Sequence, residues 1–114
     1  MDPVSAALIN RSLDGLSMRF IATAENIANA NSRNFVPVRV RFEDALRAAS
    51  AQGMEAIRQV APRMEPDPSA RAGAEMRVDL ELATASATAT RYSALLDLLG
   101  RQMQISRIVI RGGQ

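Results

Sequence analysis

The spacing of apolar residues toward the two ends of the chain limits most strongly how it can fold. Near the start, apolar or small residues recur at intervals of 3 and 4, in a series that runs Ala6, Ile9, Leu13, Leu16, Phe20, Thr23, Ile27 and Ala30. Near the end the series runs Val78, Leu82, Ala85, Ala89, Tyr92, Leu96, Leu99, Met103, Ser106 and Ile110. This alternation lines one side of an α-helix and is typical of a coiled-coil seam. The spacing predicts helices over residues 3–31 and 77–111.

The apolar residues of these helices indicate more than one packing partner. The second helix carries a second apolar flank beside its seam, made by Leu95, Leu98, Ile105 and Val109. A helix with a seam and a flank needs several neighbours to bury both. We expect the two helices to pair as a coiled-coil hairpin and to use their remaining apolar faces for assembly. The candidate seam residues are Leu13, Leu16, Phe20, Leu82, Tyr92, Leu96, Leu99, Met103 and Ile110.

Residues 32–76, between the helices, have a different character. Apolar residues alternate with polar ones from Val36 to Phe42, a period of two that indicates an extended strand. Pro37 restricts this strand to a sheet edge or an isolated arm. Short helices are expected over Glu43–Ala49 and Met54–Val60.

The stretch Pro62–Glu75 holds three Pro and a Gly with almost no large apolar side chains, so it is interpreted as a flexible loop. The sequence therefore predicts a mainly α fold with a single domain over residues 1–114. Its two long terminal helices would be joined by an extended arm and a partly disordered middle loop.

An Asn-rich block marks the end of the first predicted helix. Asn26 and Asn29 lie three residues apart, beside the seam. One interpretation is that their amides are solvated at a fraying helix end, and the residues alone favour it. The other is that they hydrogen-bond to neighbouring subunits and fix the register of packing. Asn31 and Asn34 are interpreted as turn formers.

Composition argues against several classes of function. The chain has no Cys and no His, which removes disulfides, thiolate metal sites and the commonest metal ligand and general base. An enzyme is not expected, and no catalytic, cofactor-binding or metal-binding residue is assigned. Fourteen Arg and twelve acidic residues give a net charge of +2, which does not demand a phosphate-binding surface. No apolar run approaches the roughly 20 residues of a membrane span, and the first residues do not read as a cleaved signal peptide.

Two stretches resemble the signatures of the bacterial flagellar basal-body rod protein family. LSMRFIATAENIANANSRNFVPVRVRF, residues 16–42, is similar to the N-terminal signature, with its Asn-Ile-Ala-Asn block, turn, aromatic residue and extended arm. VDLELATASATATRYSALLDLLGRQMQISRIVIRGG, residues 78–113, is similar to the C-terminal signature. Its ending, Ile110–Gly113, points to the proximal rod proteins of the B type, while Ala24–Asn31 also resembles the C type. One departure lies in the turn, where the family usually has Pro-Gly and this chain has Asn34 before Phe35; Asn can adopt positive φ and so substitute for Gly.

The resemblance implies a structural subunit of the rod, exported without a cleaved signal peptide and located in the periplasmic part of the flagellar basal body. It implies that the terminal helices pack with other subunits around an export channel and transmit torque. The implied partners are further copies of the chain in a helical assembly, other rod subunits, the hook–basal-body adaptor protein and the export gate. No nucleic acid, cofactor or membrane span is implied. The expected subunit-interface motif consists of Asn26, Ile27, Ala28, Asn29, Ala30, Asn31 and Phe35.

Two alternatives from other classes remain. The Arg residues around the arm would suit a helical hairpin that binds nucleic acid, although stacking aromatic residues are few and acidic residues are evenly mixed in. A cytoplasmic export adaptor would fit the helices but not the rod-type signatures at both ends.

Overall fold

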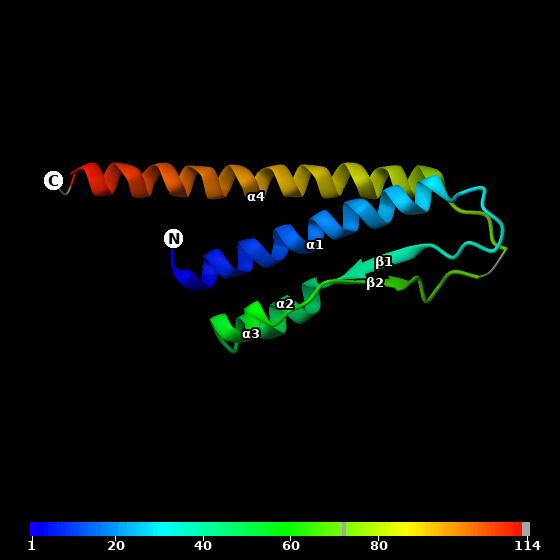
Figure 1. The fold of residues 1–114 in the computed structure, drawn as a ribbon, viewed down its shortest axis with the longest axis horizontal. Helices are drawn as coiled ribbons and strands as arrows, with labels where there is room; N and C mark the ends of the chain where they lie inside the picture. Colours follow the sequence, from blue (N-terminus) through cyan, green and yellow to red (C-terminus); the bar gives the residue numbers. More distant parts are fainter. Residues whose placement is uncertain (72, 113–114) are drawn as a thin grey trace.

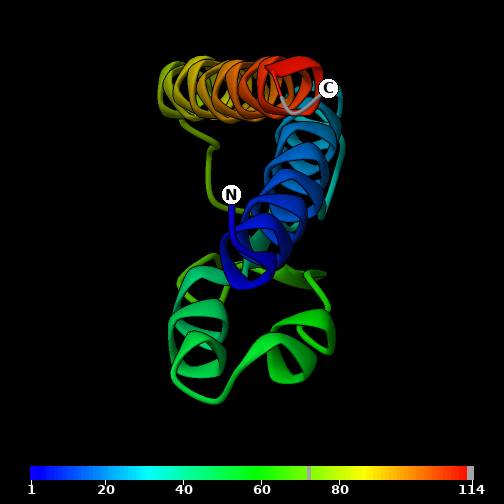
Figure 2. The ribbon, with the colours of Figure 1, turned by 90° about the vertical axis from the view of Figure 1, so that its left-hand side faces the viewer.

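The computed structural model describes residues 1–71 and 73–112 and confirms a mainly helical fold (Figure 1). The two long terminal helices lie against each other, and a small two-stranded sheet and two short helices pack on the other side of the N-terminal helix (Figures 1 and 2). In chain order the elements are α1 (Pro3–Ala28), β1 (Val38–Arg41), α2 (Glu43–Ser50), α3 (Met54–Arg58), β2 (Arg63–Pro66) and α4 (Val78–Gly112). The two short helices lie where the sequence predicts them.

Helix α1 begins and ends at residues suited to those positions. The Asp2 carboxylate accepts a hydrogen bond of 2.8 Å from the backbone N–H of Ser5, and Pro3 occupies the first turn. The helix ends at Ala28 with Asn29 as its C-cap, three residues before the predicted end. Residues 29–34 form turns instead, because Asn side chains compete for backbone hydrogen bonds.

Helix α4 runs antiparallel to α1, and the two form the expected hairpin. They approach each other where α1 ends and α4 begins, and they diverge toward the opposite end (Figures 1 and 2). At 35 residues, α4 is longer than α1 and projects past the N-terminus of α1. The molecule is correspondingly elongated, measuring 64 × 27 × 14 Å.

The predicted flexible loop contains a strand, so that part of the prediction is wrong. Strand β2 pairs antiparallel with β1, and Met64 lies opposite Val40. The apolar face of β1 packs against α1. One backbone edge of β1 remains open, and β2 pairs with that edge. Pro66 lies at the end of the ladder, where its missing N–H costs least. Residue 72 of the predicted loop and Gly113 of the C-terminal signature lie outside the described residues.

The core lies between α1 on one side and β1, α2 and α3 on the other, rather than between the two long helices. Its buried apolar side chains are Ala7, Leu16, Ala22, Val40, Phe42, Leu46, Ala49 and Ile57. Gly15 permits this packing, since a Cβ at that position would overlap the ring of Phe42.

The side of α4 that is best covered is not the seam expected from the sequence. Its covered residues are Glu81, Ala85, Thr88, Tyr92, Leu95 and Leu99, again spaced by 3 and 4. This stripe shares Ala85, Tyr92 and Leu99 with the predicted seam but is rotated from it. The expected seam residues Leu82, Leu96, Met103 and Ile110 are exposed in the chain. The apolar pattern missed the stripe because two of its members, Glu81 and Thr88, are polar.

On α1 the expected seam divides between buried and open positions. Leu16 is buried and Leu13 is half-buried, whereas Phe20 is 47 % exposed. Phe20 lines a groove on the side of the hairpin rather than its core.

Candidate functional site

Asn26, the first residue of the Asn-rich block, is fully buried and joins three segments of the chain. Its side-chain oxygen accepts a hydrogen bond of 2.8 Å from the backbone N–H of Val38. Its amide nitrogen donates to the carbonyl oxygen of Val38 at 3.0 Å and to Oε2 of Glu81 at 3.1 Å. The amide therefore pairs with β1 much as a neighbouring strand would, and it also ties the last turns of α1 to the first turn of α4.

Glu81 extends this network to the arm. Its side chain is only 4 % exposed, and its Oε1 lies 2.7 Å from Nη1 of Arg39. Arg39 also contacts Asp67 just after β2, with Nε donating to Oδ2 at 2.9 Å. We call the set Asn26, Val38, Arg39, Asp67 and Glu81 the polar clasp, because it holds α1, β1, α4 and the end of β2 together at one end of the molecule.

The charges of the polar clasp are matched to one another. Burial alone would lower the pKa of Arg39, but hydrogen bonds and attraction from Glu81 and Asp67 more than offset it, so the pKa lies above its ordinary value. The pKa of Asp67 is lowered, chiefly by hydrogen bonds from Ser69 and further by Arg39. A buried carboxylate is strongly unfavourable unless it is paired, and Glu81 is paired on both oxygens.

These contacts correct both sequence interpretations of Asn26. The amide is neither solvated at a fraying end nor available to a neighbouring subunit, since its oxygen and both of its donor hydrogens are directed at partners within the chain. Asn29 is also engaged locally. Its amide donates to the carbonyl oxygen of Glu25 at 2.9 Å, and its oxygen accepts from the Ser32 hydroxyl at 3.1 Å.

The turn after α1 has the conformation that the departure from Pro-Gly led us to expect. Asn34 has a φ of 60°, the left-handed region that Gly usually occupies. The other members of the expected interface motif lie on or near the surface: Ala28 and Asn31 are exposed, while Ile27, Ala30 and Phe35 are half-buried.

A second polar contact, made by Arg19, holds β1 and the start of α2 against the middle of α1. Arg19 donates to both carboxylate oxygens of Glu43, at 2.7 and 2.6 Å, and to the carbonyl oxygen of Val40 at 2.7 Å. Its guanidinium also lies 5.0 Å from the centre of the Phe42 ring. The hydrogen bonds from Arg19 lower the pKa of Glu43. The arm is thus fixed to α1 at two points along its length.

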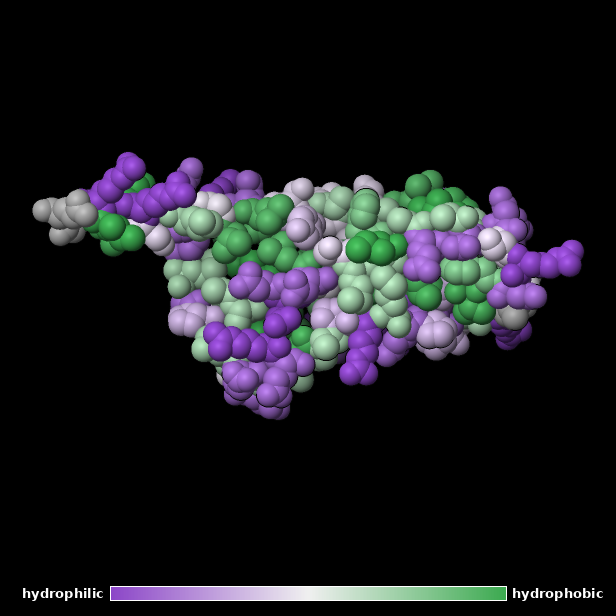
Figure 3. Space-filling model, in the orientation of Figure 1, coloured by the Kyte–Doolittle hydropathy of each residue, from purple (hydrophilic) through white to green (hydrophobic). Residues whose placement is uncertain are grey.

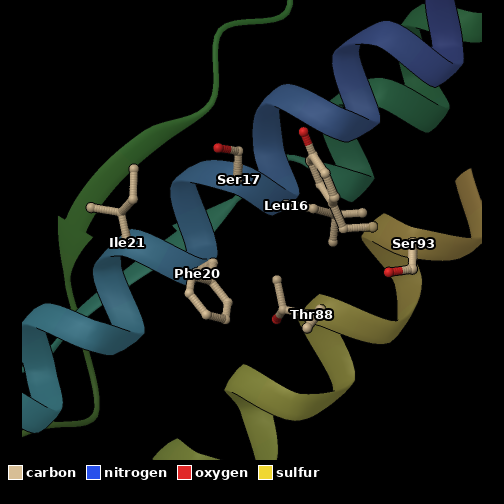
Figure 4. A pocket seen from close by; sticks show the side chains of 8 residues that line it. Leu16, Ser17, Phe20, Ile21, Thr88 and Ser93 are labelled. Carbon is tan, nitrogen blue, oxygen red and sulfur yellow. The ribbon is translucent and has the colours of Figure 1, made fainter. Parts of the chain in front are cut away.

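Beyond these anchors, the hairpin carries an open groove between α1 and α4 (Figure 4). It encloses about 300 Å³, and its lining contains no charged side chain. The lining residues are Leu16, Ser17, Phe20, Ile21, Thr88, Ala89, Tyr92 and Ser93. We call this feature the hairpin groove. It has the mixture of apolar and small polar side chains that suits the packing of another protein segment.

Large apolar side chains also lie exposed along the length of α4. The most exposed members are Leu80, Leu82, Leu96, Leu98, Met103, Ile105, Ile108, Val109 and Ile110. Figure 3 shows hydrophobic surface spread over the α4 side of the molecule. An exposed run of large apolar side chains of this kind marks an interaction surface.

Sequence reasoning missed Arg39, Asp67 and Glu81 as members of one site. Glu81 was visible as an acidic residue in the opening turn of the second helix, but nothing in its spacing indicated that it is buried. Only the three-dimensional course of the arm brings Arg39 beside it.

The described residues offer few features of other functional classes. In residues 1–71 and 73–112, acidic side chains do not gather into a group of three that would hold a metal ion. Within the same ranges, each helix is too short or too polar to serve as a membrane span.

Comparison with known proteins adds no assignment. No model of a known protein family matches the chain, and no curated protein matches it.

Proposed function

We propose that this protein is a structural subunit of the bacterial flagellar basal-body rod, closest to the proximal rod proteins of the B type. It assembles through its terminal helices, contributes to the wall of the export channel and transmits torque. Its partners are further copies of itself, other rod subunits, the hook–basal-body adaptor protein and the export gate. Its location is the periplasmic part of the flagellar basal body.

The observation that carries this proposal is the large apolar surface left open on α4. Leu82, Leu96 and Met103 belong to the expected seam and are 56, 46 and 53 % exposed in the single chain. Burying side chains of this size from complete exposure gains roughly 1.5–3 kcal/mol each, and about half of each surface is still open to burial here. A chain that leaves a row of them in solvent along one helix is suited to assembly.

The position of the polar clasp supports the same proposal. The clasp fixes the hairpin at one end through Asn26 and Glu81, two residues that lie in the stretches resembling the rod signatures. A subunit that must repeat identically in a helical assembly needs a defined angle between its helices. The polar clasp supplies a geometric constraint on that angle without using the open apolar faces.

Deletion of the gene in its host, scored for filament assembly and swimming, tests the proposal. We expect the deletion strain to lack filaments and the intact gene to restore them. Normal motility in the deletion strain would contradict the proposal.

Matched variants test whether the open apolar surface of α4 is needed for filament assembly and swimming. Leu96→Asp should fail to restore motility, because it places a charge on the apolar face of α4. Thr90→Asp introduces the same charge at an exposed polar position of the same helix, outside the hollow that Leu96 lines, and should restore it. Both purified variants should keep their helix content by circular dichroism, since neither residue is buried.

A further inference from the structure

The prolines at β2 follow the alternation of the strand. The backbone N–H of Asp67, just after β2, donates to the carbonyl oxygen of Pro37 at 2.8 Å and fixes the phase of the ladder. In an antiparallel pair only every second residue directs its N–H and C=O groups at the neighbouring strand. Counting back from Asp67, Glu65 bonds to β1, whereas Pro66 and Met64 direct their backbone groups away from it.

The outward edge of β2 is exposed but poor in hydrogen-bond donors. All four residues of β2 are exposed, and within the described ranges the strand pairs with β1 alone. Pro66 has no N–H, and Pro62, directly before the strand, falls at the next outward position beyond Met64. Of these three outward positions, only Met64 carries a backbone N–H. A further strand would therefore lack donors on either side of Met64.

The opposite edge of the sheet, on β1, is occupied by side chains from α1. Asn26 bonds both backbone polar groups of Val38, and Arg19 donates to the carbonyl oxygen of Val40 at 2.7 Å. These two contacts agree with the phase of the ladder, because the groups that they engage face away from β2. A strand that approached this edge would have to displace Asn26 and Arg19.

An open strand edge is a template on which another chain can add a strand. Proteins protect such edges with proline, which cannot donate to a ladder and is tolerated only where no donor is needed. The open apolar surface of α4 is suited to bringing copies of the chain together, so a free edge on β2 would be exposed to other copies.

We propose that Pro62 and Pro66 close the free edge of β2 to strand addition by a second copy of this chain. With the β1 edge covered by Asn26 and Arg19, the sheet cannot extend from one copy to the next on either side. Contacts between copies are thereby directed to the helices. This inference goes beyond the proposed function and does not depend on it, since it concerns the sheet and not α4.

The double variant Pro62→Thr/Pro66→Thr tests the proposal. It introduces two outward N–H groups on a residue type that favours strands. We expect the variant to self-associate at a concentration at least about tenfold below that of the wild-type chain, as measured by sedimentation velocity, because each copy gains two donors. Infrared spectroscopy should detect intermolecular strand pairing in the variant and not in the wild-type chain.

Pro37→Thr is the matched control for the loss of a proline. Its new N–H would face Asp67 across the ladder and not the solvent, so this variant should associate as the wild-type chain does. Adding Met64→Pro to the double variant should reverse the association, because it removes the central outward N–H. Circular dichroism of each variant shows whether the helices persist.

Two single substitutions test the phase of the ladder by stability alone. Met64→Pro removes an outward N–H and should change the urea unfolding midpoint little. Glu65→Pro removes a donor that bonds to β1 and should lower the midpoint clearly. Equal midpoints for the two variants would overturn the assignment of outward residues, even if the double Thr variant does not fold.

Three results on association would also overturn the proposal. The first is a folded Pro62→Thr/Pro66→Thr variant that associates no more than the wild-type chain. The second is equal association of Pro37→Thr. The third is association of the double variant that Met64→Pro does not reverse, which would assign it to another surface. The gene-deletion experiment does not depend on the sheet edge, so the two proposals fail separately.

Discussion

The side-chain amide of Asn26 pairs with both backbone polar groups of Val38, accepting from its N–H at 2.8 Å and donating to its carbonyl oxygen at 3.0 Å. A helix residue thereby takes the place of a third strand beside β1. The other amide hydrogen reaches Glu81 of α4, so one side chain satisfies groups from two segments that lie on either side of it.

Asn26→Ala should therefore be one of the most damaging substitutions in the chain. It leaves the Val38 backbone groups and one Glu81 oxygen short of partners in a buried site, which costs about 2–4 kcal/mol of unfolding free energy. Asn29→Ala is the matched control, because its side-chain contacts are local, and it should cost less than about 1 kcal/mol. Urea unfolding followed by circular dichroism measures both. Equal losses for the two variants would contradict the role given to Asn26.

Arg39 and Glu81 should show strong energetic coupling. Arg39→Met leaves the buried Glu81 carboxylate without its cation and should cost about 2–4 kcal/mol, somewhat less than for a fully buried pair because Arg39 is 37 % exposed. Glu81→Gln keeps a side chain able to accept from Asn26. The double variant should be less damaging than the sum of the two single changes, by about 1 kcal/mol or more. Strict additivity in the double-mutant cycle would argue against a direct interaction.

Two glycines in long helices should respond in opposite ways to substitution by Ala. Gly15→Ala places a Cβ against the Phe42 ring and should destabilise the fold by about 1–3 kcal/mol, despite the better helix propensity of Ala. Gly100→Ala meets nothing within 4 Å and should stabilise α4 by up to about 1 kcal/mol. Thermal unfolding of both variants measures the difference. Adding Phe42→Leu should recover part of the loss in Gly15→Ala.

The positive φ of Asn34 predicts how substitutions at this position change the stability of the fold. Asn34→Gly should leave stability unchanged or raise it slightly, because Gly adopts a φ of 60° without strain. Asn34→Ala should cost about 1 kcal/mol, since Ala disfavours the left-handed region. Unfolding midpoints in urea distinguish the two. A variant with Ala as stable as the one with Gly would mean that the turn does not need this conformation.

Acid should weaken the attachment of the arm. The Arg19 hydrogen bonds hold the pKa of Glu43 below its ordinary value of 4.5, so the unfolded chain binds a proton there at a higher pH than the folded chain does. The stability from this pair is complete above about pH 5.5 and is lost as pH falls through 4.5 toward the folded pKa. Asp67, whose pKa is also lowered, acts in the same direction.

A pH series of urea unfolding curves checks this expectation. Between about pH 6 and 3, the unfolding free energy should fall less steeply in Glu43→Gln and in Arg19→Met than in the wild-type chain. An unchanged slope in both variants would show that the pair contributes little to the acid response.

Much of the architecture was predictable because it depends on local patterns. The 3–4 spacing from Ala6 onward, the cap at Asp2 and the alternation from Val36 to Phe42 each depend on residues close in sequence. Strand β2 was not predictable in this way, because Arg63–Pro66 becomes a strand only through its pairing with β1. Its own composition favours a loop.

The polar clasp could not be predicted from the sequence either, because its members come together only in the folded chain. The hydrogen bond between Asn26 and Glu81 joins residues 55 positions apart, and neither polar residue belongs to the apolar seams that the spacing reveals. Burial of such a pair depends on where Val38 and Arg39 are placed by the arm. The sequence identifies Asn26 as unusual, but only the packed structure shows that its partners lie within the chain.

The divergence of α1 and α4 from the polar clasp has a mechanical consequence. Helix α1 is about 39 Å long, so a rotation of about 5° at the clasp would displace its N-terminal end by about 3 Å. The two helices would pivot at the polar clasp, which consists of a small number of hydrogen bonds. Small changes in the geometry around Asn26 would be amplified at the far end, where Met1 and Ala6 lie across an open groove from Met103 and Ile110.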